Sequence, residues 1–120
     1  PGYAKVKALL HAAGAAEPLA LSAVTLSEVL FKVLQLVSVK AAETTFQLLQ
    51  RLPLVVEPLT EDRARAVAGL RTRHRLSLGD AAVASLALER SARILTKDPD
   101  FLGVEAVVGV EWIVSRPRGR

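Results

Sequence analysis

Short apolar segments alternate with amphipathic helices along the chain, and this alternation restricts the folds that the chain can adopt. Leu19–Val24, Leu54–Leu59 and Ala92–Leu95 predict buried strands, and Val104–Val110 predicts a last one. Helical spacing of apolar residues fills the stretches between them. Strands that alternate with helices favour βαβ units, so we expect one α/β domain over residues 1–120, with a parallel sheet covered by helices on both faces.

Apolar spacing and capping residues predict the helices. In the second predicted helix the apolar residues, Phe31 and Leu36 among them, occupy more than one face. Such a helix is either buried or in contact with a partner, and we expect a homodimer. Thr60 is predicted to cap the fourth helix. The predicted helices span Tyr3–Ala13, Thr25–Val39, Ala42–Arg51, Thr60–Arg75 and Ser77–Ser91.

The composition excludes several kinds of site. There are no cysteines, which excludes a disulfide scaffold, a cysteine nucleophile and a thiolate zinc site, and which fits a reducing cytoplasm. Only two histidines, His11 and His74, are present, so a histidine-rich metal site is also excluded. No apolar run is long enough to cross a bilayer. We therefore expect a cytoplasmic protein with no membrane partner.

Basic residues outnumber acidic ones and gather in two places. The formal net charge is +4 and the isoelectric point is about 10.0. Much of the charge lies at Arg71, Arg73 and Arg75 and in a basic tail over residues 114–120. A basic surface favours anionic partners, nucleic acid among them. Arginines at a helix end are also typical of a solvated surface, so a phosphate contact by these three is one of two interpretations.

Acidic residues occur near the ends of the predicted strands. Glu28 comes one helical turn after the first strand, Asp98 closely follows Ala92–Leu95, and Asp80 lies in the first turn of its own helix. In parallel α/β sheets, sites gather outside the carboxyl ends of the strands. We therefore expect the carboxylates of Glu28, Asp80 and Asp98 to converge at one edge of the sheet.

Each of these acids also has a purely structural explanation. Thr25–Glu28 and Ser77–Asp80 fit the capping-box pattern, and Asp98–Asp100 fits an N-cap followed by proline at the first helical position. A cap contributes about 0.5–2 kcal/mol and needs no special surroundings. Capping does not explain three acids at corresponding ends of neighbouring units, so both interpretations stay open at this point.

A converging group of carboxylates needs a counter-charge. Two carboxylates about 4 Å apart repel each other by roughly 4 kcal/mol at an effective dielectric constant of about 20. Three of them are tolerated only when a proton or a cation lies among them. Oxygen ligands suit Mg²⁺ or Mn²⁺, which can activate water and stabilise charge on a phosphate. The acids therefore indicate phosphodiester hydrolysis with a divalent metal.

Three segments resemble the PIN domain family, specifically the VapC-like toxin ribonucleases of bacterial and archaeal toxin–antitoxin pairs. They are AVTLSEVL (Ala23–Leu30), LSLGDAAVASLALERSARILTKDPDF (Leu76–Phe101) and VEAVVGVEWI (Val104–Ile113). The most specific part is Ser-x-x-Asp-Ala followed by Leu-Thr-x-Asp-x-x-Phe. The resemblance covers nearly the whole chain. It implies a three-layer sandwich with a central parallel sheet flanked by helices, and cleavage of RNA with Mg²⁺ or Mn²⁺.

The resemblance also implies partners and residue roles. The implied partners are an RNA substrate, a cognate antitoxin protein and a second copy of the chain. By position, the carboxylates near the strand ends match the catalytic, metal-binding acids of the family. The residues carried over are Glu28, Asp80 and Asp98 as catalytic acids and metal ligands, Asp100 as a further ligand, and Thr96 and Ser77 in support.

The sequence departs from the family pattern at its start. That pattern begins with a strand that ends in a metal-binding aspartate, and nothing similar is present here, since the first residues match the helix that would follow. We therefore expect that a first strand is absent from this form and that the form is nearly inactive. The alternative is a non-catalytic PIN-like module for interaction or RNA binding. A phospho-acceptor domain is disfavoured because Lys97 adjoins Asp98 instead of lying on another strand.

Overall fold

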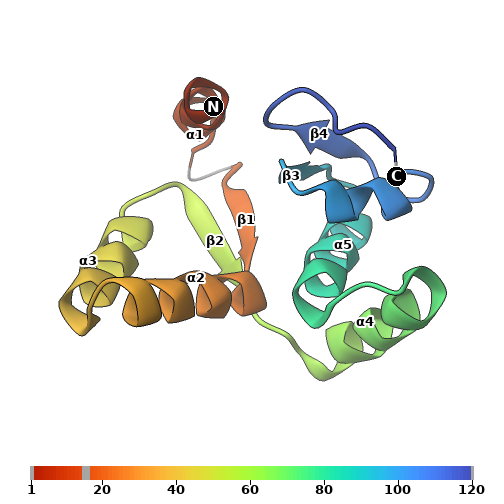
Figure 1. Ribbon diagram of the computed structural model, residues 1–120, viewed down its shortest axis with the longest axis horizontal. Helices are drawn as coiled ribbons and strands as arrows, with labels where there is room; N and C mark the ends of the chain where they lie inside the picture. The colour runs from red at the N-terminus through yellow and green to blue at the C-terminus, as the bar shows by residue number, and fades with distance from the viewer. Residues whose placement is uncertain (1, 15–16, 120) are drawn as a thin grey trace.

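The strands form two parallel pairs in the computed structural model, which describes residues 2–14 and 17–119 (Figure 1). β1 (Leu19–Ser22) pairs with β2 (Leu54–Glu57), and β3 (Ile94–Thr96) pairs with β4 (Val110–Trp112). Their parallel direction and the helices between them confirm the predicted α/β class. Over the described residues, however, the two pairs do not join into one continuous sheet.

β1 and β3 are the inner strands of the two pairs. Within the described residues, each of them pairs with one strand only, and Figure 1 shows them on the sides of the two pairs that face each other. Helix α5 (Leu78–Arg90) contacts both strands.

The hydrophobic core surrounds α5. This helix buries small residues, which allow other elements to approach its backbone closely. Helix α4 (Glu61–His74) packs along it, and the 3₁₀ helix η1 (Pro99–Val104) covers its other side. The largest fully buried side chain of the described residues is that of Val104. The core comprises Val67, Leu70, Leu76, Ala81, Ala82, Ala84, Ala87, Ile94, Phe101, Val104 and Val108.

Helix α2 (Ala23–Leu36) begins earlier than predicted. The hydroxyl of Ser22 accepts a hydrogen bond from the amide of Val24 at 3.2 Å, so Ser22 is the N-cap. The predicted start at Thr25 and its capping box with Glu28 are wrong, because the end of β1 already supplies the cap. Glu28 instead lies in the second turn of α2, where its carboxylate is available for other contacts.

The predicted helices Thr25–Val39 and Ala42–Arg51 are both present, but the boundary between them lies earlier than predicted. α2 ends at Leu36, and α3 (Val39–Gln50) starts after Ser38, whose hydroxyl accepts a hydrogen bond from the amide of Ala41 at 2.9 Å. The prediction rested on the spacing of apolar residues. That spacing does not detect the cap at Ser38, because a cap depends on a single side chain.

The last predicted strand also differs from the observed one. Val104 ends η1 instead of opening a strand, and β4 begins only at Val110. Val104 and Val108 are four residues apart, and both are buried in the core around α5. A helical turn places both side chains on one side and keeps the backbone close to α5. A strand would also place them on one side, but its backbone would extend away from α5.

β1 and β2 begin where they were predicted to begin, but each ends two residues earlier than predicted. α1 (Tyr3–Ala12) has the predicted extent to within one residue, and Thr60 caps α4 by accepting a hydrogen bond from the amide of Arg63. None of the helices in the described ranges is both long and apolar enough to span a membrane.

Candidate functional site

Asp80 is placed by the cap of α5. The hydroxyl of Ser77 accepts a hydrogen bond from the backbone amide of Asp80 at 3.2 Å, which confirms Ser77 as the N-cap. The carboxylate of Asp80, in the first turn of the helix, is half-buried. The helix dipole favours a negative charge at this end of α5.

A tight turn after β3 places two further acids. The hydroxyl of Thr96, a buried residue, accepts a hydrogen bond from the amide of Asp98 at 3.0 Å. A carboxylate oxygen of Asp98 in turn accepts a hydrogen bond from the amide of Asp100 at 2.9 Å. Pro99 occupies the first turn of η1, so Asp98 is a cap as predicted. Both exposed carboxylates thus lie just beyond the carboxyl end of β3.

The structure brings three carboxylates together. One carboxylate oxygen from each of Asp80, Asp98 and Asp100 lies within 4.8 Å of the other two. Burial raises the pKa of Asp80, and the negative charges of Asp98, Asp100 and Glu28 raise it further, while its hydrogen bond with Ser77 acts in the opposite direction. The helix caps and the cluster of carboxylates are therefore both present at this site, and capping alone does not account for the cluster.

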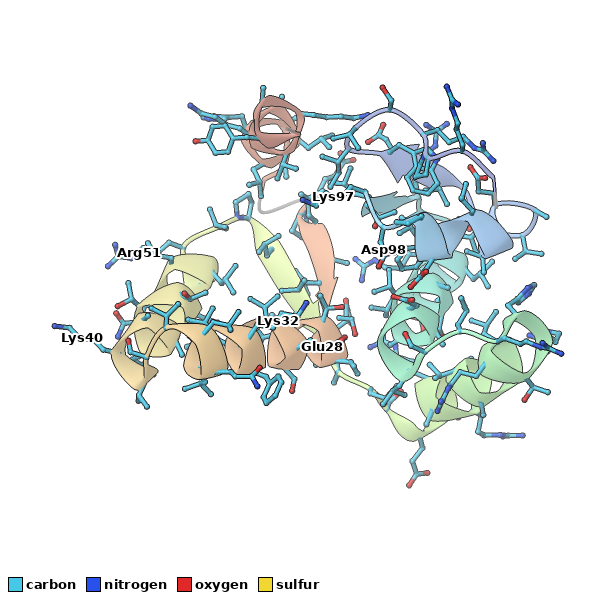
Figure 2. The ribbon with its side chains drawn as sticks, in the orientation of Figure 1. Glu28, Lys32, Lys40, Arg51, Lys97 and Asp98 are labelled. Carbon is cyan, nitrogen blue, oxygen red and sulfur yellow. The ribbon has the colours of Figure 1, made fainter. Side chains whose placement is uncertain are left out.

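Glu28 reaches the same region from α2. A Cβ placed on Gly79 would overlap the Glu28 carboxylate, so this carboxylate lies directly against the residue that precedes Asp80. Figure 2 shows Glu28 and Asp98 on elements that face each other, at the start of α2 and the start of η1. Glu28 is adjacent to the three-aspartate group without being a member of it.

Gly79 is a site residue that the sequence analysis missed. Its backbone is not left-handed, so no turn requires a glycine at this position. The missed signal is a glycine in the first turn of a helix where alanine would be the stronger helix former. The structure supplies the reason, because any side chain at this position would displace Glu28.

The three aspartates fit a divalent cation. Two oxygens on opposite sides of Mg²⁺ are about 4.2 Å apart, because Mg–O bonds are about 2.1 Å long. At most one pair of the three oxygens can lie on opposite sides of the ion, so the other separations, now up to 4.8 Å, would have to shorten to about 3 Å by rotation of the side chains. An all-oxygen donor set suits Mg²⁺ and Mn²⁺, and a cation would relieve the repulsion that raises the pKa of Asp80.

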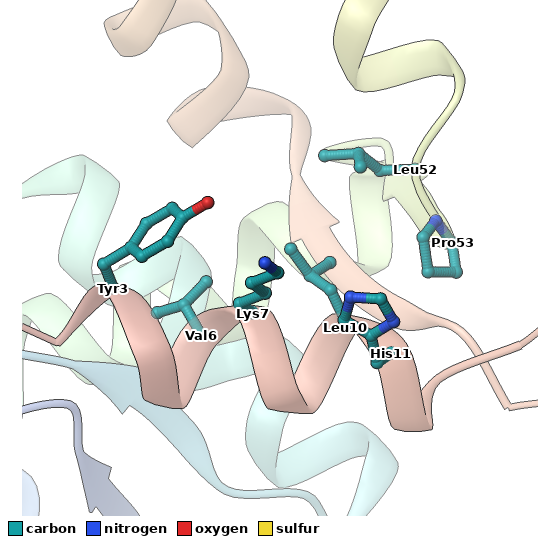
Figure 3. A pocket seen from close by; sticks show the side chains of 7 residues that line it. All are labelled: Tyr3, Val6, Lys7, Leu10, His11, Leu52 and Pro53. Atoms are coloured by element: carbon teal, nitrogen blue, oxygen red, sulfur yellow. The ribbon is translucent and has the colours of Figure 1, made fainter.

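The other candidate residues lie elsewhere. Arg71 and Arg73 are in the last turn of α4, and Arg75 is its C-cap. A separate pocket of about 380 Å³ lies between α1 and the turn before β2, with Leu10 and Pro53 in its mainly apolar lining (Figure 3). It contains none of the acids described above.

The chain matches one known family. A family model described as the PIN domain matches residues 1–107, a range that includes Glu28, all three aspartates and Gly79. No curated protein and no solved structure matches the chain.

Proposed function

The chain belongs to the PIN domain family, whose members are generally nucleases, and from this premise we propose that it is an endoribonuclease dependent on Mg²⁺ or Mn²⁺. The observation that carries the proposal is the group of Asp80, Asp98 and Asp100, which the fold places at the carboxyl end of β3. Three acids at that position suit divalent metal chemistry better than they suit capping alone.

Some residues of the site would bind the ion, and others position the residues that bind it. A bound divalent ion would supply an activated water and would stabilise charge on the scissile phosphate. Asp80, Asp98 and Asp100 would hold it, with Glu28 as a further acid beside Asp80. Thr96 and Ser77 fix the backbone amides of Asp98 and Asp80, so each orients one acid without contacting substrate.

We further propose that this nuclease is the toxin of a toxin–antitoxin pair that acts in the cytoplasm as a homodimer. The support is the resemblance to VapC-like toxins and the apolar surface of α2 and α3, where large hydrophobic side chains are exposed. Exposed apolar patches mark interaction surfaces. A second copy would cover part of this surface, and a cognate antitoxin would cover the rest.

One observation favours a second candidate function. Asp98 and Asp100 are exposed to solvent, where water stabilises their charges without a metal. The acid group is therefore also compatible with a non-catalytic PIN-like module that binds RNA or a protein. This module would neither need nor respond to a divalent ion, so the two candidates differ in a single measurement.

That measurement is cleavage of single-stranded RNA with Mg²⁺, with Mn²⁺ and with EDTA. We expect slow cleavage that occurs only with metal, in keeping with the low activity expected of this form, and loss of that cleavage in Asp98→Asn. Asp62→Asn is the matched control, because Asp62 is an acid in the first turn of α4, outside the carboxylate group. Cleavage that survives EDTA or Asp98→Asn would contradict the metal mechanism. Absence of cleavage with retained RNA binding would favour the non-catalytic module.

A further inference from the structure

A basic hollow of about 480 Å³ lies at the junction of α4 and α5. Resting on the proposed function, we propose that this α4–α5 hollow holds a phosphate of the RNA strand whose cleavage takes place at the carboxylate site. Arg71 and Arg75 would be the phosphate ligands. The residues that line the hollow are Ala68, Arg71, Thr72, Arg75 and Leu76.

Helix geometry brings these two arginines together and separates the third. Arg71 and Arg75 are four residues apart, so their side chains lie on one face of α4. Arg73, two residues from each, points to the opposite side, where its guanidinium packs over Gly69 with Nη1 3.2 Å from the position of an added Cβ. The sequence alone does not distinguish the three arginines, but only Arg71 and Arg75 line the hollow.

Arg71 is held in place before any ligand arrives. Its Nε donates a hydrogen bond to the carbonyl oxygen of Leu76 at 3.3 Å, and Leu76 is itself buried in the core. The two terminal amino groups of the guanidinium remain available for the oxygens of a phosphate. A side chain that is already ordered loses less conformational freedom when it binds.

Neither arginine of the hollow is neutralised by a carboxylate. Arg63, Arg90 and Arg116 form ion pairs with glutamates, whereas no ion pair involves Arg71 or Arg75 in the parts of the chain that the structure describes. An incoming anion would therefore not have to displace a protein carboxylate. The first group of arginines stabilises the fold, and the second remains free to contact a partner.

The hollow is close enough to the carboxylates for one RNA strand to reach both. Leu76, in its lining, precedes Asp80 by four residues, which a fully extended chain would span in at most about 14 Å. A phosphate held in the hollow would orient the strand so that another phosphate lies among the aspartates. Phosphate contacts of this kind fix the position of a nucleic acid without reading its sequence.

Arginines at the C-terminal end of a helix also interact favourably with the helix dipole. This simpler explanation predicts that substitution of these arginines has a small effect on the stability of the fold and none on RNA binding. It applies equally to Arg71, Arg73 and Arg75, whereas a phosphate ligand role distinguishes Arg73 from the other two. The three arginines therefore form a matched set for an experiment.

The experiment measures binding of a fluorescein-labelled single-stranded RNA of mixed sequence, in EDTA so that no metal-dependent cleavage occurs. The full chain is compared with Arg71→Gln, Arg75→Gln and the double variant, and with Arg73→Gln as the matched control. Each lost phosphate contact lowers the slope of log binding constant against log salt by about 0.7 for a single strand. Because both arginines contact the same phosphate, we expect a decrease of about 0.7 for the double variant and none for Arg73→Gln.

Three results would overturn the proposal. Equal weakening by Arg73→Gln would mean that only net charge matters. Unchanged RNA binding in the double variant would remove the phosphate contact. Loss of poly-glutamate binding in that variant, with RNA binding retained, would assign the hollow to an acidic protein partner. Thermal melting of each variant controls for unfolding, and Arg71→Lys, which keeps the charge but not the two amino groups, is expected to recover binding only in part.

The outcome also separates this inference from the proposed nuclease. Metal-dependent cleavage that needs Asp98 but is unaffected by the double arginine variant would leave the nuclease intact and refute the hollow. Arginine-dependent RNA binding without any cleavage would leave the hollow intact as an RNA contact and refute the nuclease.

Discussion

Gly79 decides where the Glu28 carboxylate can lie, because the space that a side chain would occupy on Gly79 is filled by that carboxylate. The contact joins α2 to the first turn of α5 at the residue before Asp80. A glycine here costs helix stability, so its presence favours a functional reason over a structural one.

We predict that Gly79→Ala separates stability from function. The free energy of unfolding in EDTA should stay constant or rise by up to about 1 kcal/mol, because alanine is the better helix former. Metal affinity and RNA cleavage should fall by roughly 10- to 100-fold, as is typical when a group that positions a ligand is moved. Manganese titration and thermal melting measure the two effects.

Gly103→Ala is the matched control, since an added Cβ there meets no atom within 4 Å. It should leave metal affinity unchanged. If Gly79→Ala bound manganese and cleaved RNA as well as the parent, the position of Glu28 would have no importance for the site.

The ionised Asp80 carboxylate should cost the metal-free protein stability. Its pKa is raised by burial first and then by the neighbouring acids, so the folded state holds this proton to a higher pH than the unfolded chain does. The cost is therefore absent below about pH 4, develops as the pH rises through the raised pKa, and is complete above it.

We expect Asp80→Asn in EDTA to melt at a higher temperature than the parent at pH 7 and at the same temperature near pH 3.5. Asp62→Asn should instead melt at a lower temperature than the parent at pH 7. The substitution removes a favourable interaction with the N-terminus of α4 and relieves no clustered charge. A lower melting temperature for Asp80→Asn at pH 7 would show that the acids do not repel one another.

At the level of elements, α2 and α3 leave an apolar surface uncovered. Leu36 is 78% exposed, Val39 76% and Phe31 60%. Leu36 and Val39 flank the connection between the two helices, and Phe31 lies in the second half of α2. The homodimer expected from Phe31 and Leu36 remains a prediction, and these fractions show that the side chains are accessible to a partner. A stable interface buries about 800 Å² on each partner.

We predict a dimer at micromolar concentration by light scattering, and a monomer for Phe31→Asp combined with Leu36→Asp. Leu88→Asp is the control, because Leu88 is also an exposed leucine but lies on α5. A monomeric parent, or a dimer that Leu88→Asp disrupts equally, would place the interface elsewhere or remove it.

In the whole molecule, two halves meet beside α5. Figure 1 shows α2, α3, β1 and β2 on one side and α4, α5, β3 and β4 on the other. Arg63 of α4 forms ion pairs with Glu57 at the end of β2, at 3.0 Å, and with Glu89 of α5, at 2.7 Å. The hydrogen bond from Arg63 holds the pKa of Glu89 below its usual value. These pairs connect β2, α4 and α5.

A cation bound by the acids should therefore stabilise the whole fold. It would link α5 to the turn after β3 and, through Glu28, to α2. A ligand present at 100 times its dissociation constant adds about 2.7 kcal/mol to the free energy of unfolding. We predict that Mn²⁺ or Mg²⁺ raises the melting temperature of the parent and leaves that of Asp98→Asn unchanged. An equal rise with KCl at matched ionic strength would show screening in place of binding.

Three of the capping residues and the spacing of the acids could be predicted from the sequence alone. Ser77, Thr60 and Asp98 cap the elements that they were predicted to cap, because a cap bonds to an amide two or three residues away. The alternation of strands and helices likewise gave the α/β class, since apolar periodicity depends only on neighbouring residues. The same logic placed Asp80 and Asp98 at ends of elements.

Tertiary structure decided the features that join distant parts of the chain. β4 starts at Val110 because it pairs with β3, and Val104 turns inward because α5 offers it a core, neither of which local periodicity can register. The contact of Glu28 with Gly79 spans 51 residues of sequence and depends on how α2 lies against α5. Helix packing also determined which arginines line the hollow. Local hydrogen bonds are encoded within one turn of chain, whereas a site built from several elements exists only after they pack.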